Sequence, residues 1–136
     1  MDNGRELIMY NRKYLRELYK DDSESYMYDD KRYNRDGEIE EYGFSVMETW
    51  NLDTALVELL YERLMRYKTQ AIVDLKLHTE WGDEELNGMT QLEVINYLIE
   101  LCKDYLLDDD FITGGRDIKN KKIWKVWTAL SPAMWW

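Results

Sequence analysis

The chain has 136 residues and carries 28 acidic side chains against 18 basic ones, a formal net charge of −10 at pH 7. Proteins bind a phosphate backbone through Lys and Arg, so this charge argues against ordinary nucleic-acid binding and favours a basic protein partner. A single cysteine excludes an intramolecular disulfide. We find neither an apolar run of the roughly 18 residues that a membrane helix needs nor a signal-peptide pattern, and therefore expect a soluble cytoplasmic protein.

The first predicted helix extends from Asn3 to about Lys20, and Asn3 with Glu6 has the spacing of a capping box. The helical period then stops, and residues 21–42 hold nine acidic and three basic side chains together with several tyrosines. We expect this stretch to be an irregular acidic loop of a single helical domain, whose core is formed by residues 45–136. Loops of this length are often functional or disordered.

A short turn from Ser45 and a second helix over residues 51–70 are predicted next. Asn51 is a favourable N-cap residue, and Asp53 lies in the first turn, where the helix dipole favours an anion. Trp50 precedes the helix and is expected to be largely buried across its entry. The expected buried stripe consists of Leu52, Leu56, Leu59, Leu60, Leu64 and Tyr67.

Two further helices are predicted in the second half of the chain. From residue 71 the pattern is compatible with a helix or a short strand, and residues 78–89 are typical of a loop. The third helix begins at Thr90, which forms a capping box with Glu93, and the fourth covers residues 117–130. Their expected inward residues are Leu92, Ile95, Leu98, Ile99, Cys102, Tyr105 and Leu106, then Ile123, Val126, Trp127 and Leu130. The predicted fold is mainly α, a single-domain bundle of about four helices with a long acidic Tyr-rich loop.

Candidates for nucleophilic or metal chemistry are few. Cys102 lies on the apolar face of the third helix and is interpreted as a small core residue. His78 has Asp74 and Glu80 close by in sequence, but a zinc site needs three or four ligands. We expect no cofactor, no metal ion and no catalytic residue.

Two carboxylate pairs occur at helical spacing, Glu58 with Glu62 and Glu100 with Asp104. All-helical nucleotide pyrophosphohydrolases hold Mg²⁺ with carboxylates on facing helices, which would face the inside of the bundle. Both pairs fall on the predicted polar sides of their helices, so we favour solvated faces over a metal site. Arg63 interrupts the apolar stripe and is expected to snorkel or to pair with a buried carboxylate.

Clusters of acidic residues are the predicted partner-binding surface. The candidates are Asp29, Asp30, Glu38, Glu40, Glu41, Asp108, Asp109 and Asp110. The last three end a helix, where the dipole disfavours anions, and sequences sometimes break such local rules for function. Solubility alone is the simpler explanation, and the basic segment 116–125 could also neutralise this cluster.

The segments "GFSVMETWNLD" (43–53), "RLMRYK" (63–68), "EVINYLIELCKDYLLDDD" and "IWKVWTALSPAMWW" follow one another along the chain. In these segments the sequence resembles a group of small phage-encoded acidic helical proteins with a Gly-aromatic-Ser start and a Thr-Trp-x-Leu-Asp motif. The resemblance covers about residues 43–136, but the usual proline after the first of these helices is missing. It implies no catalytic residue.

Taken together, these features predict a non-enzymatic phage accessory protein that binds another protein in the host cytoplasm. It would act, for example, as an acidic inhibitor of a host defence factor with a basic surface. One alternative is a minor virion or assembly component. A third, less favoured alternative is a Mg²⁺-dependent all-α nucleotide hydrolase. A homo-oligomer is compatible with the sequence.

Overall fold

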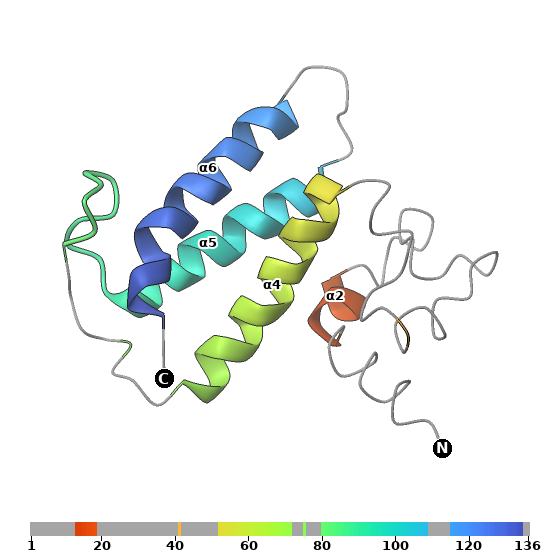
Figure 1. The fold of residues 1–136 in the computed structure, drawn as a ribbon, viewed down its shortest axis with the longest axis horizontal. Helices are drawn as coiled ribbons and strands as arrows, with labels where there is room; N and C mark the ends of the chain where they lie inside the picture. The colour runs from red at the N-terminus through yellow and green to blue at the C-terminus, as the bar shows by residue number, and fades with distance from the viewer. Residues whose placement is uncertain are drawn as a thin grey trace. The chain divides into compact units, whose positions relative to one another are not determined.

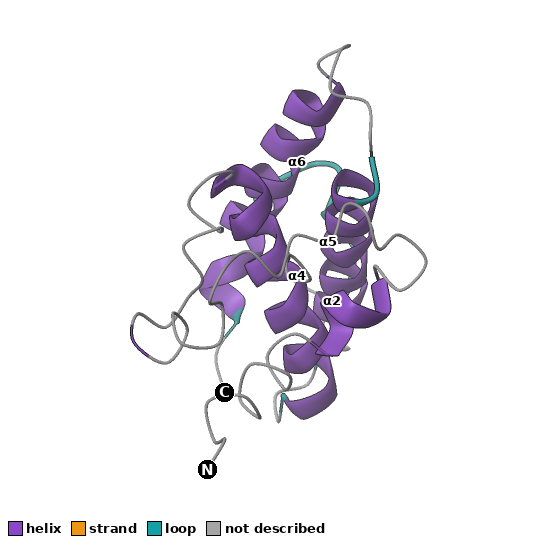
Figure 2. Cartoon of the chain, turned by 90° about the vertical axis from the view of Figure 1, so that its right-hand side faces the viewer, coloured by secondary structure: helices purple, strands orange, loops and turns teal. Residues whose placement is uncertain are grey.

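The computed structural model describes residues 13–18, 41, 52–71, 75, 80–108 and 115–134, which are mainly helical and include no β-strand (Figures 1 and 2). The predicted mainly α fold is thus confirmed. The elements are α2 (Lys13–Leu18), α4 (Leu52–Gln70), α5 (Gln91–Leu106), α6 (Gly115–Leu130) and the 3₁₀ helix η3 (Ser131–Ala133). None of these helices combines the length and the apolar character needed to cross a membrane. The chain divides into two compact units, residues 1–62 and 63–136.

In the first unit, a buried carboxylate holds the start of α2. The backbone N–H of Tyr14 donates to Glu62 Oε1 at 3.1 Å, and that of Leu15 donates to Oε2 at 2.9 Å. The first N–H groups of a helix have no partner within it, so Glu62 supplies the acceptors that α2 lacks. The side chain of Leu15 is fully buried. The remainder of the first predicted helix, and Trp50, lie outside the described residues.

The buried side of α4 differs from the predicted stripe. Leu60 and Leu64 are buried as predicted, but Leu52, Leu56 and Leu59 are 55%, 43% and 40% exposed. Helix geometry places these three on the side opposite Val57 and Tyr61, which are buried. The prediction failed because it assigned every leucine inward.

Arg63 continues the exposed line of leucines and is itself exposed. Arg63 therefore does not extend through an apolar layer, in contrast to the snorkelling expected from the sequence. The burial of Glu58 and Glu62, at 2% and 4% exposed, also contradicts the solvated face expected for this pair. Helix α4 turns carboxylates inward and three leucines outward.

In the second unit, α5 and α6 lie side by side and run in opposite directions (Figure 1). The predicted capping box begins α5: Glu93 N–H donates to Thr90 Oγ1, and Thr90 N–H donates to Glu93 Oε1, both at 3.1 Å. Helix α6 starts two residues before the predicted Asp117 and ends at Leu130, as predicted from Pro132. The buried residues of both helices are Gln91, Val94, Ile95, Leu98, Ile99, Cys102, Tyr105, Leu106, Ile123, Val126 and Leu130.

Polar contacts of Gln91, the first residue of α5, and of Asn96 join this helix to η3 and to the end of α4. Gln91 Nε2 donates to the carbonyl oxygen of Ala133 in η3 at 3.1 Å. One turn further along, Lys68 Nζ donates to Asn96 Oδ1 at 3.2 Å. These polar contacts fix the beginning of α5 against the end of α4 and the C-terminal turn.

The connection before α5 is a loop over residues 80–89, as predicted, but it is packed rather than open. Trp81 and Leu86 are 7% and 0% exposed, and Trp81 Nε1 donates to the carbonyl oxygen of Met89 at 3.1 Å. Gly82 and Gly88 have φ angles of 69° and 90°, which glycine adopts without a steric penalty. The two glycines allow the tight turns that return Trp81 to the core.

Candidate functional site

The acidic end of α5 is paired with α6. Lys119 Nζ lies 2.8 Å from Asp108 Oδ2 and 3.5 Å from Asp104 Oδ2. The hydrogen bond to Asp108, assisted by both negative charges, raises the pKa of Lys119. Arg116, in the first turn of α6, contacts the ring of Tyr105 at 4.3 Å and donates to its carbonyl oxygen at 3.4 Å. The expected neutralisation of this cluster by the basic segment is therefore seen at Asp104 and Asp108.

A second charged network joins the loop 80–89 to both helices. Glu85 Oε1 accepts from the Tyr97 hydroxyl at 2.6 Å and from Lys122 Nζ at 2.9 Å. These two hydrogen bonds lower the pKa of Glu85, whereas burial and the bond to the carboxylate raise the pKa of Tyr97. Hydrogen bonding to Tyr97 and to Glu85 raises the pKa of Lys122. Nearby, Lys125 Nζ lies 3.4 Å from Asp83 Oδ2.

Three lysines of α6 thus pair with acidic side chains of the same unit. Exposed acids remain around them in the part of the chain that the structure describes. They include Glu80, Glu84, Glu93, Glu100 and Asp117. Exposed bases, among them Lys121 on α6 itself, accompany these acids.

The predicted partner-binding acids fall in different surroundings. Asp29, Asp30, Glu38, Glu40, Asp109 and Asp110 lie outside the described residues. Glu41 is described and exposed. Asp108 is described and has a side chain only 14% exposed, because it contacts Lys119. Of the predicted set, Asp108 has a structural contact and Glu41 is accessible.

The two carboxylate pairs considered as metal ligands differ in their exposure to solvent. Glu100 and Asp104 have side chains 70% and 67% exposed, as predicted. Glu58 and Glu62 are buried, which makes the predicted solvated face wrong, and both oxygens of Glu62 accept backbone N–H groups of α2. Over the described residues, no group of three or more His, Cys, Asp or Glu is placed to hold a metal ion.

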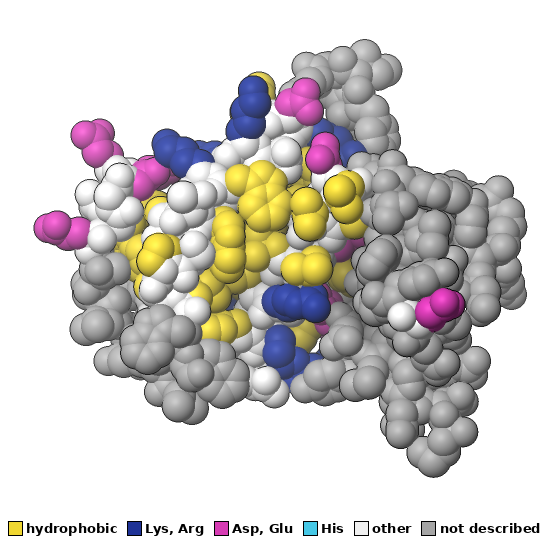
Figure 3. Space-filling model, in the orientation of Figure 1, with side chains coloured by type: hydrophobic (Ala, Val, Ile, Leu, Met, Phe, Trp, Pro, Cys, Tyr) yellow, Lys and Arg dark blue, Asp and Glu magenta, His cyan; other side chains and the backbone are white. Residues whose placement is uncertain are grey.

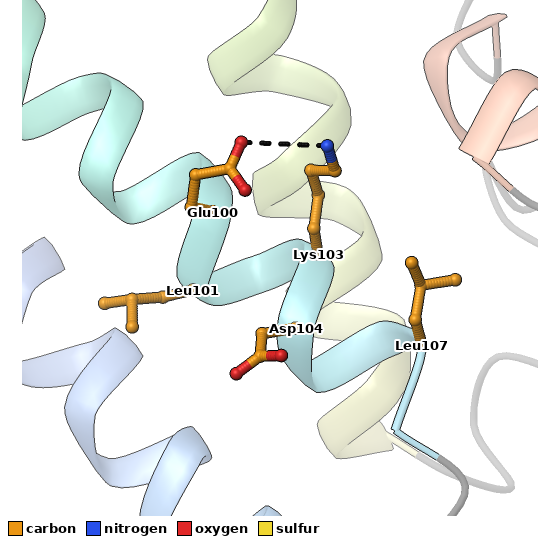
Figure 4. A pocket seen from close by; sticks show the side chains of 5 residues that line it. All are labelled: Glu100, Leu101, Lys103, Asp104 and Leu107. Atoms are coloured by element: carbon orange, nitrogen blue, oxygen red, sulfur yellow. Dashed lines mark ion pairs between the residues drawn. The ribbon is translucent and has the colours of Figure 1, made fainter.

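A shallow groove runs along the surface of α5 (Figure 4). Its lining residues are Glu100, Leu101, Lys103, Asp104 and Leu107. Figure 4 shows Glu100 and Lys103 turned toward one another, and their charged atoms are 3.6 Å apart. Leu101 and Asp104 point elsewhere, so the groove lacks the convergent polar groups of a catalytic pocket.

Cys102 is a core residue, as predicted. It is fully buried, and the loss of solvation raises the pKa of its thiol from 9.0 to about 12. Because the thiolate is the nucleophilic form, this cysteine is unsuited to covalent catalysis at neutral pH. His78 and Asp74 lie outside the described residues, and Glu80 is exposed.

Hydrophobic side chains also reach the surface of the second unit, where Figure 3 shows them gathered over α5, with Lys and Arg at the edges. Leu107 and Ile118 are 51% and 71% exposed.

Comparison of the chain with protein-family models, curated proteins and solved structures gave no match. The resemblance to phage proteins therefore stays a prediction.

Proposed function

We propose that this chain is a non-enzymatic binding protein that recruits a basic protein partner through an acidic surface. The observation that supports it is the internal pairing of Lys119, Lys122 and Lys125 with acids of their own unit. These bases are engaged within the fold, while the chain keeps a net charge of −10. An accessory role in a phage, such as inhibition of a host factor, follows from the sequence resemblance.

The expected contribution of such a surface is to the rate of association. Complementary charges speed the encounter of two proteins more than they strengthen the final complex. Their reach is about 8 Å at physiological ionic strength, so added salt should slow the encounter. The acids proposed to contribute are Asp29, Asp30, Glu38, Glu40 and Glu41 in residues 1–62 and, considered separately, Asp109 and Asp110 in residues 63–136, without the ion-paired Asp108.

The partner is sought in lysate of a bacterial host at low and at high ionic strength. Its association rate is then measured with the variant Glu38→Gln/Glu40→Gln/Glu41→Gln. The matched control removes the same number of charges from exposed acids outside the clusters, as Glu80→Gln/Glu84→Gln/Asp117→Asn. The proposal predicts a slower, less salt-dependent association for the first variant and a smaller change for the control.

Equal effects of the two variants would show that net charge acts without a defined surface. Recovery of no salt-sensitive partner would overturn the binding role. Co-purification with capsids alone would favour the virion component considered above.

A further inference from the structure

The exposed line on α4 has the spacing of a helix–helix seam. Leu52, Leu56, Leu59 and Arg63 follow one another at intervals of four, three and four residues. Alternating intervals of three and four keep side chains on the line along which two helices pack as a coiled coil. The three leucines are 55%, 43% and 40% exposed, so this seam is accessible on α4. Scattered exposed leucines need no explanation, but a line of three exposed leucines over about two helical turns does.

Charge is distributed unequally along this seam. Asp53 is exposed in the first turn of α4, beside Leu52, and Arg63 is exposed at the other end of the line. A second copy in parallel orientation would place Arg63 beside Arg63. An antiparallel copy would instead place Arg63 across from Leu52 and close to Asp53, with Leu56 packed against Leu59.

We propose that α4 pairs with α4 of a second copy in an antiparallel, two-fold symmetric dimer. Leu56 and Leu59 form its centre, and Asp53 of each copy faces Arg63 of the other. The symmetry supplies each charge contact twice, as in any isologous interface. A seam of three leucines per copy is smaller than a standard interface of about 1,600 Å², so we expect a weak, concentration-dependent dimer.

Sedimentation velocity of the full chain over a concentration series tests this pairing. The wild type should shift from monomer to dimer as its concentration rises, whereas Leu56→Glu/Leu59→Glu should remain monomeric. These side chains are exposed, so the far-ultraviolet circular dichroism of the variant should match the wild type. Leu107→Glu, at a comparably exposed leucine that follows the last residue of α5, is the matched control and should still dimerise.

A charge-reversal cycle tests the antiparallel orientation. Asp53→Arg and Arg63→Asp should each raise the dimer dissociation constant about tenfold or more, because each brings like charges together. The double variant Asp53→Arg/Arg63→Asp restores opposite charges and should dimerise within a factor of about three of the wild type. A double variant as weak as the single variants would overturn the antiparallel seam. A wild type that stays monomeric at every concentration would overturn the dimer, and would assign the leucines to another segment of the chain or to a different protein.

Discussion

Helices α4 and α5 follow the same apolar period in sequence, but the period predicts the buried face of only one. In α5, the inward residues Ile95, Leu98, Ile99 and Cys102 are all buried, and Glu100 and Asp104 are solvated. In α4, three predicted leucines are exposed and Glu58 and Glu62 are buried. The difference arises because Glu62 has a specific polar role inside the fold, as the acceptor of two N–H groups of α2. Hydrophobic periodicity identifies the buried face where the polar side chains stay at the surface, as in α5, and fails where one of them binds buried backbone, as in α4.

The largest expected difference in the free energy of unfolding is between variants at two neighbouring leucines of α4. Leu59 and Leu60 are adjacent in sequence, but they are 40% and 6% exposed. Leu60→Ala should lower the free energy of unfolding by about 2–5 kcal/mol, because it leaves a cavity in packed surroundings. Leu59→Ala should cost less than about 1 kcal/mol. Urea denaturation followed by circular dichroism measures both.

Ile99→Ala provides the matching measurement on α5, where the residue is 4% exposed. Its expected loss is again about 2–5 kcal/mol. Equal losses for Leu59→Ala and Leu60→Ala would show that the predicted stripe, rather than the observed face, is buried.

The buried carboxylate of α4 gives the next largest effect. Glu62→Ala removes the acceptor of two backbone N–H groups and should destabilise the chain by about 2–4 kcal/mol, because hydrogen bonds to charged groups are the strong ones. Amide hydrogen exchange should accelerate at Tyr14 and Leu15. Glu100→Ala, at a side chain 70% exposed, is the control and should change stability little. Unchanged exchange at both amides in Glu62→Ala would refute the capping role.

A smaller loss is expected at the start of α5. Thr90→Ala removes the side-chain oxygen that accepts the N–H of Glu93 and should cost about 1 kcal/mol. Thr90→Ser keeps this acceptor and should stay close to the wild type. A stability of Thr90→Ala equal to that of Thr90→Ser would contradict the observed cap.

These contrasts show which features of the molecule could be predicted from residues that lie close together in the sequence. The capping box at Thr90 was predictable because its two hydrogen bonds join residues three positions apart. The role of Glu62 was not, because its partners are 47 and 48 residues away. The burial of Trp81 depends on hydrogen bonds to residues six and eight positions away that close a loop, a separation that neither the helical nor the capping pattern covers.

For the candidate site, the sequence predicted the charge balance but not its distribution. For the cluster at Asp108, the sequence was compatible with partner binding, with solubility alone and with pairing to the basic segment. Which lysine would reach it depended on the antiparallel packing of α5 and α6. The spacing of Leu52, Leu56 and Leu59 can be read from the sequence, but only the structure shows that these leucines are exposed.

The smallest expected effect concerns the ion pair between Lys119 and Asp108, the contact that fixes one predicted binding residue in the fold. Lys119→Gln should lower stability by about 0.5–1 kcal/mol at neutral pH and low salt, whereas Lys121→Gln, at an exposed lysine of the same helix, should have little effect. Both replacements have similar helix propensity, so the comparison isolates the contact. The pKa of Lys119 is raised above 10.5, so its stabilisation is fully present below pH 10.5 and is lost as the pH rises through the raised value. The difference between the two variants should therefore shrink in alkaline solution and in high salt, as thermal unfolding can measure. A difference that persisted under both conditions would show that Lys119 stabilises the chain through packing rather than charge, and would leave Asp108 available to a partner.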